Sequence, residues 1–145
     1  MNSITINYNM KYIKKNLYQA TAGSSGFDLS ADIASNHIIA PNTLAKLSTG
    51  IYLELSKGIE AQIRSRSGLA YHSSIFVLNA PGTIDSDYTG EVQVLLYNLG
   101  NKEFVISPGA KIAQMVFTNI IIPNDSNITL SNYIRKDSGF GSSGL

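Results

Sequence analysis

Arginine is scarce in this chain, and its placement suggests a site for phosphate. Among the 145 residues the arginines are Arg64, Arg66 and Arg135. The first two share the stretch IRSRSGLA with hydroxyl side chains and a glycine. A guanidinium presents a fork of donors that matches phosphate oxygens, and a glycine lets the backbone approach a ligand. Taken alone, the stretch is more typical of a polar turn after a strand, with a serine capping a short helix.

A pair of carboxylates in the stretch NAPGTIDSDYTGEV could supply a general base. Asp85 and Asp87 are two residues apart, so an extended backbone would aim both to one face, with Ser86 and Tyr88 on the other. An aspartate with an ordinary pKa of ~3.9 is ionised at neutral pH and can activate a water molecule. Taken alone, this stretch is more typical of an Asp-rich turn.

Two further polar residues interrupt apolar stretches, and a glycine-serine tail ends the chain. Asp28 stands between apolar neighbours in AGSSGFDLSAD, and Gln114 stands inside the β-rich run AKIAQMVF. Each is typical of a solvated side chain on the polar face of a strand. The tail RKDSGFGSSGL, residues 135–145, is typical of a flexible or disordered segment. That interpretation leaves its arginine and its phenylalanine unexplained.

The elements that must position these residues are predicted to be strands. Apolar and polar residues alternate in SITINYNMKYI, GIYLEL, GIEAQIR and EVQVLLYN, and further β-rich runs are EFVIS, AQMVF and TNIIIP. Turn signals separate these runs, and Pro108-Gly109 fits the centre of a type II turn. The only helix expected is short, at residues 67–74. The pattern predicts one all-β domain, a sandwich or a barrel.

Composition narrows the class of protein. A chain of 145 residues suits one domain, and a net charge of +1 does not favour a nucleic-acid partner. The absence of cysteine excludes disulfides and cysteine-based zinc sites, and two histidines do not favour a histidine-rich metal site. The beginning of the chain has no apolar run typical of a signal or membrane segment. We therefore expect a cytoplasmic protein without a membrane partner, or a nuclear one if the source is a eukaryote or its virus.

Together, these stretches resemble the trimeric deoxyuridine triphosphate nucleotidohydrolase (dUTPase) family. That family carries five motifs in fixed order, and their counterparts over residues 22–144 are AGSSGFDLSAD, RSRSGLA, NAPGTIDSDYTGEV, PGAKIAQMVF and RKDSGFGSSG. The resemblance implies an all-β, jelly-roll-like (β-clip) subunit with one short helix. It also implies a homotrimer whose C-terminal arm is exchanged between subunits. We thus expect a core at residues 1–134 and a tail at 135–145 that closes over a neighbouring subunit's active site.

The resemblance implies hydrolysis of dUTP to dUMP and pyrophosphate, with Mg²⁺ as cofactor. Asp85 would be the catalytic base that activates a water for attack on the α-phosphorus, and Asp28 would hold magnesium through water. Tyr88 would pack on the deoxyribose and exclude a 2′-hydroxyl. The other implied substrate-binding residues are Arg66, Ser67, Gly68 and Gln114 for the phosphates, Asn79, Gly82 and Ile84 for uracil, and Arg135, Phe140, Gly141 and Ser142 in the tail.

One rival activity has the same fold. In dCTP deaminase, alone or combined with dUTPase activity, a glutamate performs the deamination. This chain supplies the hydrolase aspartate and tyrosine in TIDSDY, and Glu91 lies downstream in GEV. A non-catalytic binding domain and a structural jelly roll remain alternatives, but neither explains why all five motifs are present. The tail departs from the family pattern at Lys136 and Ser138, which replace glycines, and this bears on tail closure.

Overall fold

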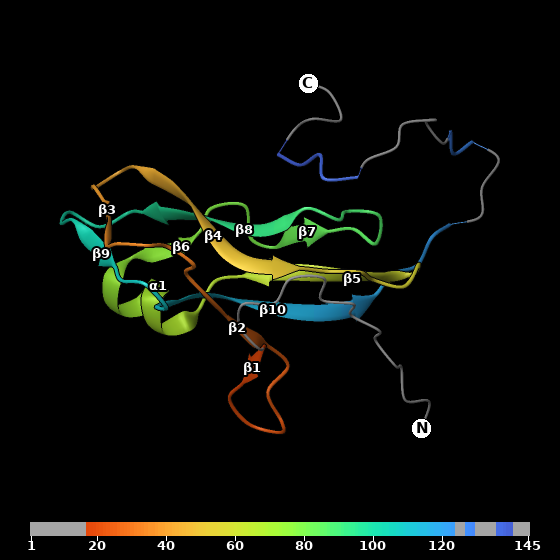
Figure 1. The fold of residues 1–145 in the computed structure, drawn as a ribbon, viewed down its shortest axis with the longest axis horizontal. Coiled ribbons are helices and arrows are strands. Elements are labelled where there is room, and N and C mark those ends of the chain that lie inside the picture. Colours follow the sequence, from red (N-terminus) through yellow and green to blue (C-terminus); the bar gives the residue numbers. More distant parts are fainter. Residues whose placement is uncertain (1–16, 124–126, 130–135, 141–145) are drawn as a thin grey trace.

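A computed structural model of the chain describes residues 17–123, 127–129 and 136–140. In this part of the chain the fold consists of strands and one short helix, which confirms the predicted all-β class (Figure 1). The elements in chain order are β1 (Tyr18–Gln19), β2 (Phe27–Ser30), β3 (His37–Ile39), β4 (Leu44–Tyr52), β5 (Ile59–Arg64), α1 (Ser67–Ser73), β6 (Ile75–Val77), β7 (Gly82–Ile84), β8 (Glu91–Asn98), β9 (Phe104–Ile106) and β10 (Lys111–Asn119).

The described strands form three antiparallel sheets. Five strands pair in the order β1-β2-β10-β5-β7, three in the order β4-β8-β6, and β3 pairs with β9. In β5 and β8 every second residue is buried, because one face of each strand turns to the interior. Leu29 on β2, Leu47 on β4, Leu96 on β8 and Met115 on β10 belong to the same apolar cluster. The two larger sheets therefore share one core.

Several predicted runs coincide with strands, and two extend too far. GIEAQIR and EVQVLLYN are β5 and β8, and EFVIS and AQMVF coincide largely with β9 and β10. The strand predicted in TNIIIP ends at Asn119, and Ile121 beyond it is 95% exposed. The strand predicted in GIYLEL ends at Tyr52, although Leu53 and Leu55 are buried. The run SITINYNMKYI, residues 3–13, lies outside the described residues.

The predicted turn and helix are confirmed, but the helix begins differently. The amide of Ala110 donates to the carbonyl of Ser107 at 3.0 Å, and Gly109 has φ 77°, as a type II turn requires. Helix α1 starts at Ser67, after Arg66 as its N-cap, and no side chain caps it. A serine cap is therefore wrong for this helix. The helix ends at Ser73, and its C-cap, Ser74, adopts the left-handed conformation.

The strand register decides which face of the five-stranded sheet each motif occupies. Asp28 on β2 pairs with Gln114 on β10. In the next row Met115 pairs with Ile63 on β5, and Ile63 pairs with Gly82 on β7. Side chains in adjacent rows point to opposite faces. Met115 and Ile63 are buried in the core, so Asp28 and Gln114 lie on the face that turns away from it.

Candidate active site

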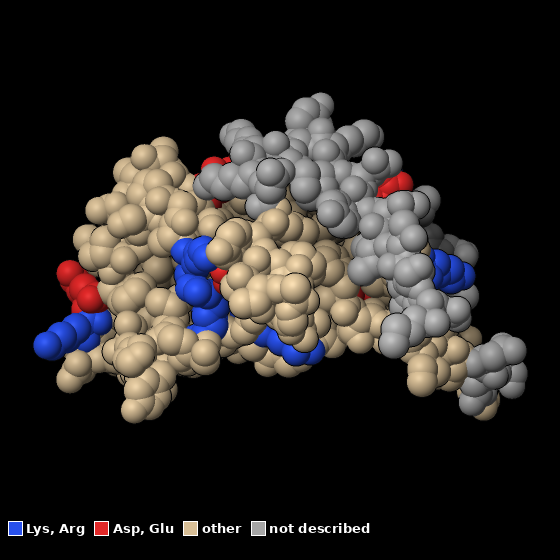
Figure 2. Space-filling view, turned by 90° about the horizontal axis from the view of Figure 1, so that it is seen from below, with Lys and Arg blue, Asp and Glu red and all other residues tan. Residues whose placement is uncertain are grey.

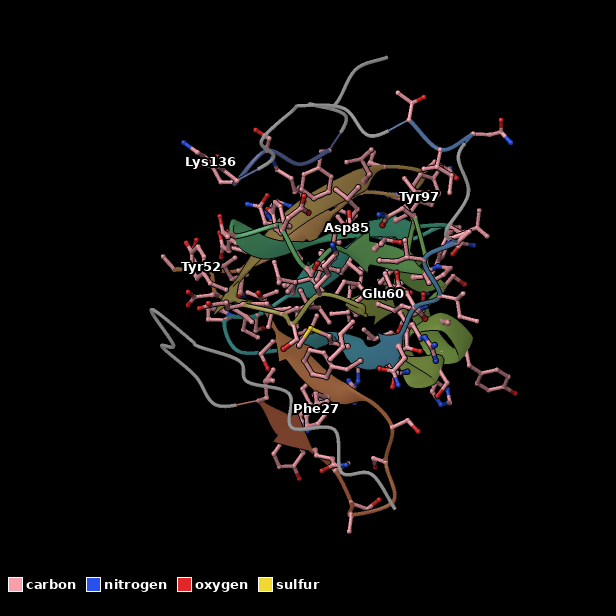
Figure 3. All side chains as sticks on the ribbon, turned by 90° about the vertical axis from the view of Figure 1, so that its right-hand side faces the viewer. Phe27, Tyr52, Glu60, Asp85, Tyr97 and Lys136 are labelled. Atoms are coloured by element: carbon pink, nitrogen blue, oxygen red, sulfur yellow. The ribbon has the colours of Figure 1, made fainter. Side chains whose placement is uncertain are left out.

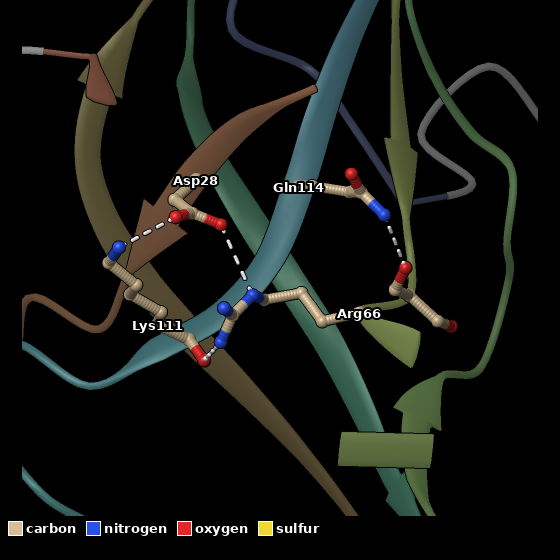
Figure 4. Close-up of polar contacts among 5 residues, drawn as sticks. Asp28, Arg66, Lys111 and Gln114 are labelled. Atoms are coloured by element: carbon tan, nitrogen blue, oxygen red, sulfur yellow. Dashed lines mark hydrogen bonds and ion pairs between the residues drawn. The ribbon is translucent and has the colours of Figure 1, made fainter. Parts of the chain in front are cut away.

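Three charged side chains meet on the outer face of the sheet, and we call Asp28, Arg66 and Lys111 the cationic cluster. Arg66 Nε lies 3.1 Å from Asp28 Oδ1, and Lys111 Nζ lies 2.8 Å from Asp28 Oδ2 (Figure 4). Arg66 Nη1 also donates to the carbonyl of Lys111 at 3.0 Å. The Asp28 side chain is only 14% exposed, against 34% for Arg66 and 40% for Lys111. The cations therefore keep surface open toward an anion, and the cluster carries a net positive charge.

Gln114 holds the turn that carries Arg66. Its Nε2 donates to the carbonyl of Ser65 at 2.9 Å (Figure 4). Ser65 Oγ in turn accepts the amide of Val77 at 2.9 Å. A Cβ on Gly26 would collide with Oε1 of Gln114, so glycine leaves the room that this amide occupies. The contacts of Gln114 thus fix the loop between β5 and α1.

Ser67 and Gly68 follow Arg66 at the exposed start of α1. Both residues are exposed, and a Cβ on Gly68 would meet no atom within 4 Å. Their backbone is accordingly open to an incoming ligand beside the cationic cluster. Figure 2 views the molecule from the side of β1 and β2, and shows Lys and Arg side chains gathered near the middle of that face.

Asp85 and Tyr88 stand at the two ends of a tight turn after β7. The amide of Tyr88 donates to the carbonyl of Asp85 at 3.1 Å. The Asp-rich turn that the stretch alone favours is therefore present, and the extended backbone that would aim Asp85 and Asp87 to one face is not. The turn follows the edge strand β7, at the opposite end of the sheet from Phe27 on β2 (Figure 3). Asp85 is half-buried at the position where the strand gives way to the turn.

A cavity of about 150 Å³ lies beside this turn, and we call it the hairpin pocket. Its lining residues are Ile63, Asn79, Gly82, Thr83, Ile84, Tyr88, Glu91, Gln93, Gly139 and Phe140. The fold thus brings together the residues that the resemblance implied for uracil and deoxyribose, and one from the tail. Asp85 follows Ile84 directly, so the expected base adjoins the pocket wall.

Tyr88 is locked into the pocket wall. Its phenol donates to the carbonyl of Glu91 at 2.9 Å, and the residue is only 9% exposed. Burial raises the pKa of Tyr88 above its ordinary value of 10.0, and the nearby Glu91, Asp137 and Tyr52 raise it further. A Cβ on Gly90 would lie 2.6 Å from Tyr88 Oη, so the ring occupies space that only glycine leaves free.

The described part of the tail lies on the hairpin pocket of its own chain. The carbonyl of Lys136 accepts the amide of Thr89 at 2.9 Å. Phe140 lines the pocket, and Lys46 Nζ lies 5.4 Å from the centre of its ring. Arg135, Gly141 and Ser142 lie outside the described residues. In this single chain the contact is internal, and the exchange of the tail between subunits stays a prediction.

The hairpin pocket and the cationic cluster lie on opposite faces of the five-stranded sheet. The pocket takes Ile63 and Gly82 from the row that faces the core, and it reaches the edge of the sheet at Thr83, whose row faces away from the core. Asp28 and Gln114 belong to the adjacent row, which faces away. A hydrogen-bonded sheet leaves no passage for a ligand between its faces. The two groups of residues in one chain therefore cannot contact the same small molecule directly through the sheet.

Two contributors to these sites were missed from the sequence. Lys111 had no signal beyond its position at the start of a β-rich run, and its contact with Asp28 depends on the strand register. Glu91 was noted only as part of GEV. Its Oε1 accepts the amide of Gly50 at 2.8 Å, and Ser48 Oγ donates to its Oε2 at 3.3 Å.

The sequence model of the dUTPase family matches residues 14–144 of this chain. The chain belongs to the dUTPase family. A dUTPase, deoxyuridine 5'-triphosphate nucleotidohydrolase, of Orientia tsutsugamushi (strain Ikeda) is 50% identical over 127 residues, which cover 87% of this chain and 86% of that protein. The corresponding dUTPase of Hydrogenobaculum sp. is 47% identical over 129 residues, covering 88% of this chain and 89% of that protein.

Solved dUTPase structures share the fold. The crystal structure of the Streptococcus mutans dUTPase matches with a TM-score of 0.71 at 20% identity, covering 81% of this chain and 98% of that chain. A mutant dUTPase of Staphylococcus bacteriophage 80alpha, solved with dUpNHpp, matches with a TM-score of 0.73 at 19% identity, covering 99% of this chain and 100% of that one. These matches confirm the predicted subunit fold.

The rival dCTP deaminase is not favoured. The family match and the relatives named above are all dUTPases. The carboxylate of Glu91 is also hydrogen-bonded to β4, at Gly50 and Ser48, in the manner of a structural residue.

Among the described residues, no helix has the length and apolar character needed to cross a membrane.

Proposed function

We propose that this chain hydrolyses dUTP to dUMP and pyrophosphate at a site that combines the hairpin pocket with a cationic cluster from a second copy. The observation that carries the proposal is the hairpin pocket itself. In a member of the dUTPase family, Asn79, Tyr88 and Phe140 surround a cavity that adjoins the carboxylate-bearing turn at Asp85. In the cell, this reaction would keep uracil out of DNA and supply dUMP for thymidylate synthesis.

The uracil ring would lie against β7. This strand is last in its sheet among the described strands, so the backbone of Gly82 and Ile84 has one side available to a planar base. The Asn79 amide offers both a donor and an acceptor. Cytosine would leave some of these groups unmatched, and the narrow pocket would leave no room for the methyl group of thymine. Phe140 would cover the base by stacking.

The proposed chemical step is attack of a water on the α-phosphorus. Asp85 would take the proton from this water, a contribution typically of ~10²–10⁴-fold to the rate. Tyr88, held by the Glu91 carbonyl, would pack on the deoxyribose at the position where a 2′-hydroxyl would clash. The bond between the α-phosphorus and the oxygen that bridges to the β-phosphorus would break, and pyrophosphate would leave with that oxygen and the electron pair of the bond. The oxygen of the water would remain on dUMP.

The triphosphate would be held by cations and by open backbone. Arg66 is suited to forked contacts with phosphate oxygens, and Ser67 and Gly68 follow it at an exposed position. Gln114 would contribute by holding the loop that carries Arg66. Its amide would contact a phosphate directly if the side chain turned away from the Ser65 carbonyl. Arg135, Gly141 and Ser142 of the tail would close over the phosphates and exclude bulk water.

The placement of the two groups on opposite faces of one sheet supports a shared site in a homotrimer. One chain offers the hairpin pocket on one face and the cationic cluster on the other. Rotation about a threefold axis would bring the pocket of one subunit to the cluster of the next, and closure would generate three equal sites. The tail of the third subunit would then close each site.

The residues present suit a magnesium ion that arrives with the substrate. The described residues contain no group of three or more His, Cys, Asp or Glu that could cage a metal. Asp28 is one carboxylate, and it is already balanced by Arg66 and Lys111. Mg²⁺ keeps several waters and binds through few carboxylates plus substrate phosphates, so Asp28 would hold it through water. Bound there, the ion would neutralise phosphate charge.

Pyrophosphate release across dUTP, dTTP, dCTP and UTP tests the proposed function. We expect release from dUTP alone at a substantial rate, because the pocket rejects the 5-methyl group, the cytosine amino group and the 2′-hydroxyl. Ammonia release from dCTP is measured in parallel. Ammonia from dCTP would support the dCTP deaminase alternative, and equal hydrolysis of all four nucleotides would refute the proposed pocket.

We also propose a cytoplasmic location, which fractionation of the source cells would test.

A further inference from the structure

Glu91 joins the hairpin pocket to a bulge in the neighbouring strand. It is the first residue of β8 and pairs with Tyr52 on β4. Its side chain reaches back along β4, where Oε1 accepts the amide of Gly50 at 2.8 Å and Oε2 accepts the hydroxyl of Ser48 at 3.3 Å. The register of β4 against β8 shifts between Ser48 and Ile51, so Gly50 lies in the bulge.

The Gly50 amide needs this carboxylate. Gly50 is buried and has φ 70°, a conformation that takes its amide out of the regular ladder. A buried amide without an acceptor costs free energy, and a charged acceptor forms one of the stronger hydrogen bonds. The Glu91 side chain therefore stabilises the bulge, and the bulge in turn holds the start of β8 in place.

The backbone of the same residue holds Tyr88. The phenol of Tyr88 donates to the Glu91 carbonyl at 2.9 Å, and the ring packs over Gly90. Glu91 also lines the hairpin pocket. Its side chain is thus anchored to β4 while its carbonyl anchors the ring that faces the pocket. A shift of the carbonyl would move the ring, since the tyrosine hydroxyl would follow its acceptor or lose it.

We propose that Glu91 is a positioning residue that sets how strongly the site rejects a 2′-hydroxyl, acting through Tyr88. This inference rests on the proposed function and adds a specificity determinant to it. Glu91 touches no reacting atom in this assignment. Its carboxylate fixes the bulge of β4, and its carbonyl fixes the ring that borders the sugar.

The test compares kcat/KM for dUTP and UTP on the same preparation of each variant. The ratio does not depend on the fraction of folded enzyme, so a loss of stability alone does not move it. We expect Glu91→Ala to lower the ratio by about tenfold, which is the effect of one lost positioning hydrogen bond. Glu91→Gln keeps an oxygen for the Gly50 amide and should keep the wild-type ratio. Glu54→Ala removes an exposed carboxylate as the matched control and should change nothing.

Glu91→Leu is the second variant, because it fills the volume of Glu91 while removing both acceptors. An unchanged ratio in Glu91→Ala or Glu91→Leu would overturn the proposal, and so would a tenfold loss in Glu91→Gln. Failure of both Glu91→Ala and Glu91→Leu to fold, with Glu91→Gln intact, would assign Glu91 a purely structural role and also overturn it. If the wild-type chain does not hydrolyse dUTP, the proposed function itself fails, and that result is separate.

Discussion

Asp85 carries the proposed chemistry on a single half-buried carboxylate at the end of β7. The turn that follows fixes its backbone, because the Tyr88 amide bonds to the Asp85 carbonyl. A base must stand within reach of the proton that it takes, so its placement matters as much as its ionisation. The turn provides that placement beside the hairpin pocket.

Replacing Asp85 by Asn should remove turnover and spare binding. The amide has nearly the same size but cannot take a proton, so we expect kcat to fall by ~10²–10⁴-fold. Titration with a non-hydrolysable dUTP analogue should give an affinity close to that of the wild type. Asp87→Asn, in the same turn, is the matched control and should retain turnover. Near-normal kcat in Asp85→Asn would remove Asp85 from the proposed role.

Tyr88 should make the free energy of unfolding depend on pH at the alkaline end. Burial, then Glu91, Asp137 and Tyr52, raise its pKa above 10.0 in the folded chain. The folded state thus favours the neutral phenol. Its contribution to stability is fully present below pH 10.0, the unfolded value, and is lost as pH rises through the higher folded value.

Urea unfolding of the wild type and Tyr88→Phe between pH 8 and 11 measures this contribution. The difference between the two free energies of unfolding should stay constant up to about pH 10 and shrink above it. The other tyrosines titrate in both proteins, so they cancel in the difference. A difference that stays constant to pH 11, or grows, would contradict the raised pKa.

At the scale of elements, the tail contacts the proposed site and lies apart from the hydrophobic core. Its described part contributes the Lys136 carbonyl to the Thr89 amide, and Phe140 to the hairpin pocket. The core lies elsewhere, between the two larger sheets. Removal of the tail should therefore affect the site and leave the fold intact.

Truncation after Tyr133 should leave a folded trimer with dUTP turnover reduced by about a hundredfold, because the closed site is lost. Circular dichroism and sedimentation check the fold and assembly, and pyrophosphate release measures turnover. Phe140→Ala, which keeps the rest of the tail, should give an intermediate loss. Full activity in the truncated chain would contradict the proposed role of the tail in closing the active site.

The elements differ in how well the sequence predicts them, for physical reasons. β8 was predicted because one face is buried and the other is not, so its alternation is regular. Most of β4 was missed, since Leu44 is 57% exposed and the polar Thr49 is buried, which obscures the pattern. β3, β6 and β7 have three residues each, too few for alternation to show, and β9 of the same length was predicted only from its β-rich run EFVIS.

The candidate site was predicted by resemblance more than by pattern. Periodicity placed Asp28 on the polar face of a strand, but its ion pairs with Arg66 and Lys111 depend on which strands become neighbours. The turn at Asp85 was one of two alternatives that the residues left open. The contact of Phe140 with the hairpin pocket joins residues far apart in the chain, and no local signal predicts it.

At the scale of the whole molecule, one sheet separates the two halves of the proposed site. The hairpin pocket uses the row of Ile63 and Gly82, and the cationic cluster uses the adjacent row of Asp28. We propose that a substrate that needs both bridges two copies of the chain. The proposed homotrimer would then be a requirement of the proposed chemistry as well as a state of assembly.

Subunit mixing tests this claim most directly. Asp85→Asn lacks the proposed base and Arg66→Ala lacks a proposed phosphate-binding cation, and each alone should be nearly inactive. The two variants are co-expressed in equal amounts, and the whole population of trimers, with homotrimers included, is assayed for pyrophosphate release from dUTP. A shared site draws its hairpin from one subunit and its cluster from another, so about a quarter of the sites should recover both intact parts. Activity near a quarter of the wild type is the predicted result, and activity no higher than that of the separate variants would contradict the shared site.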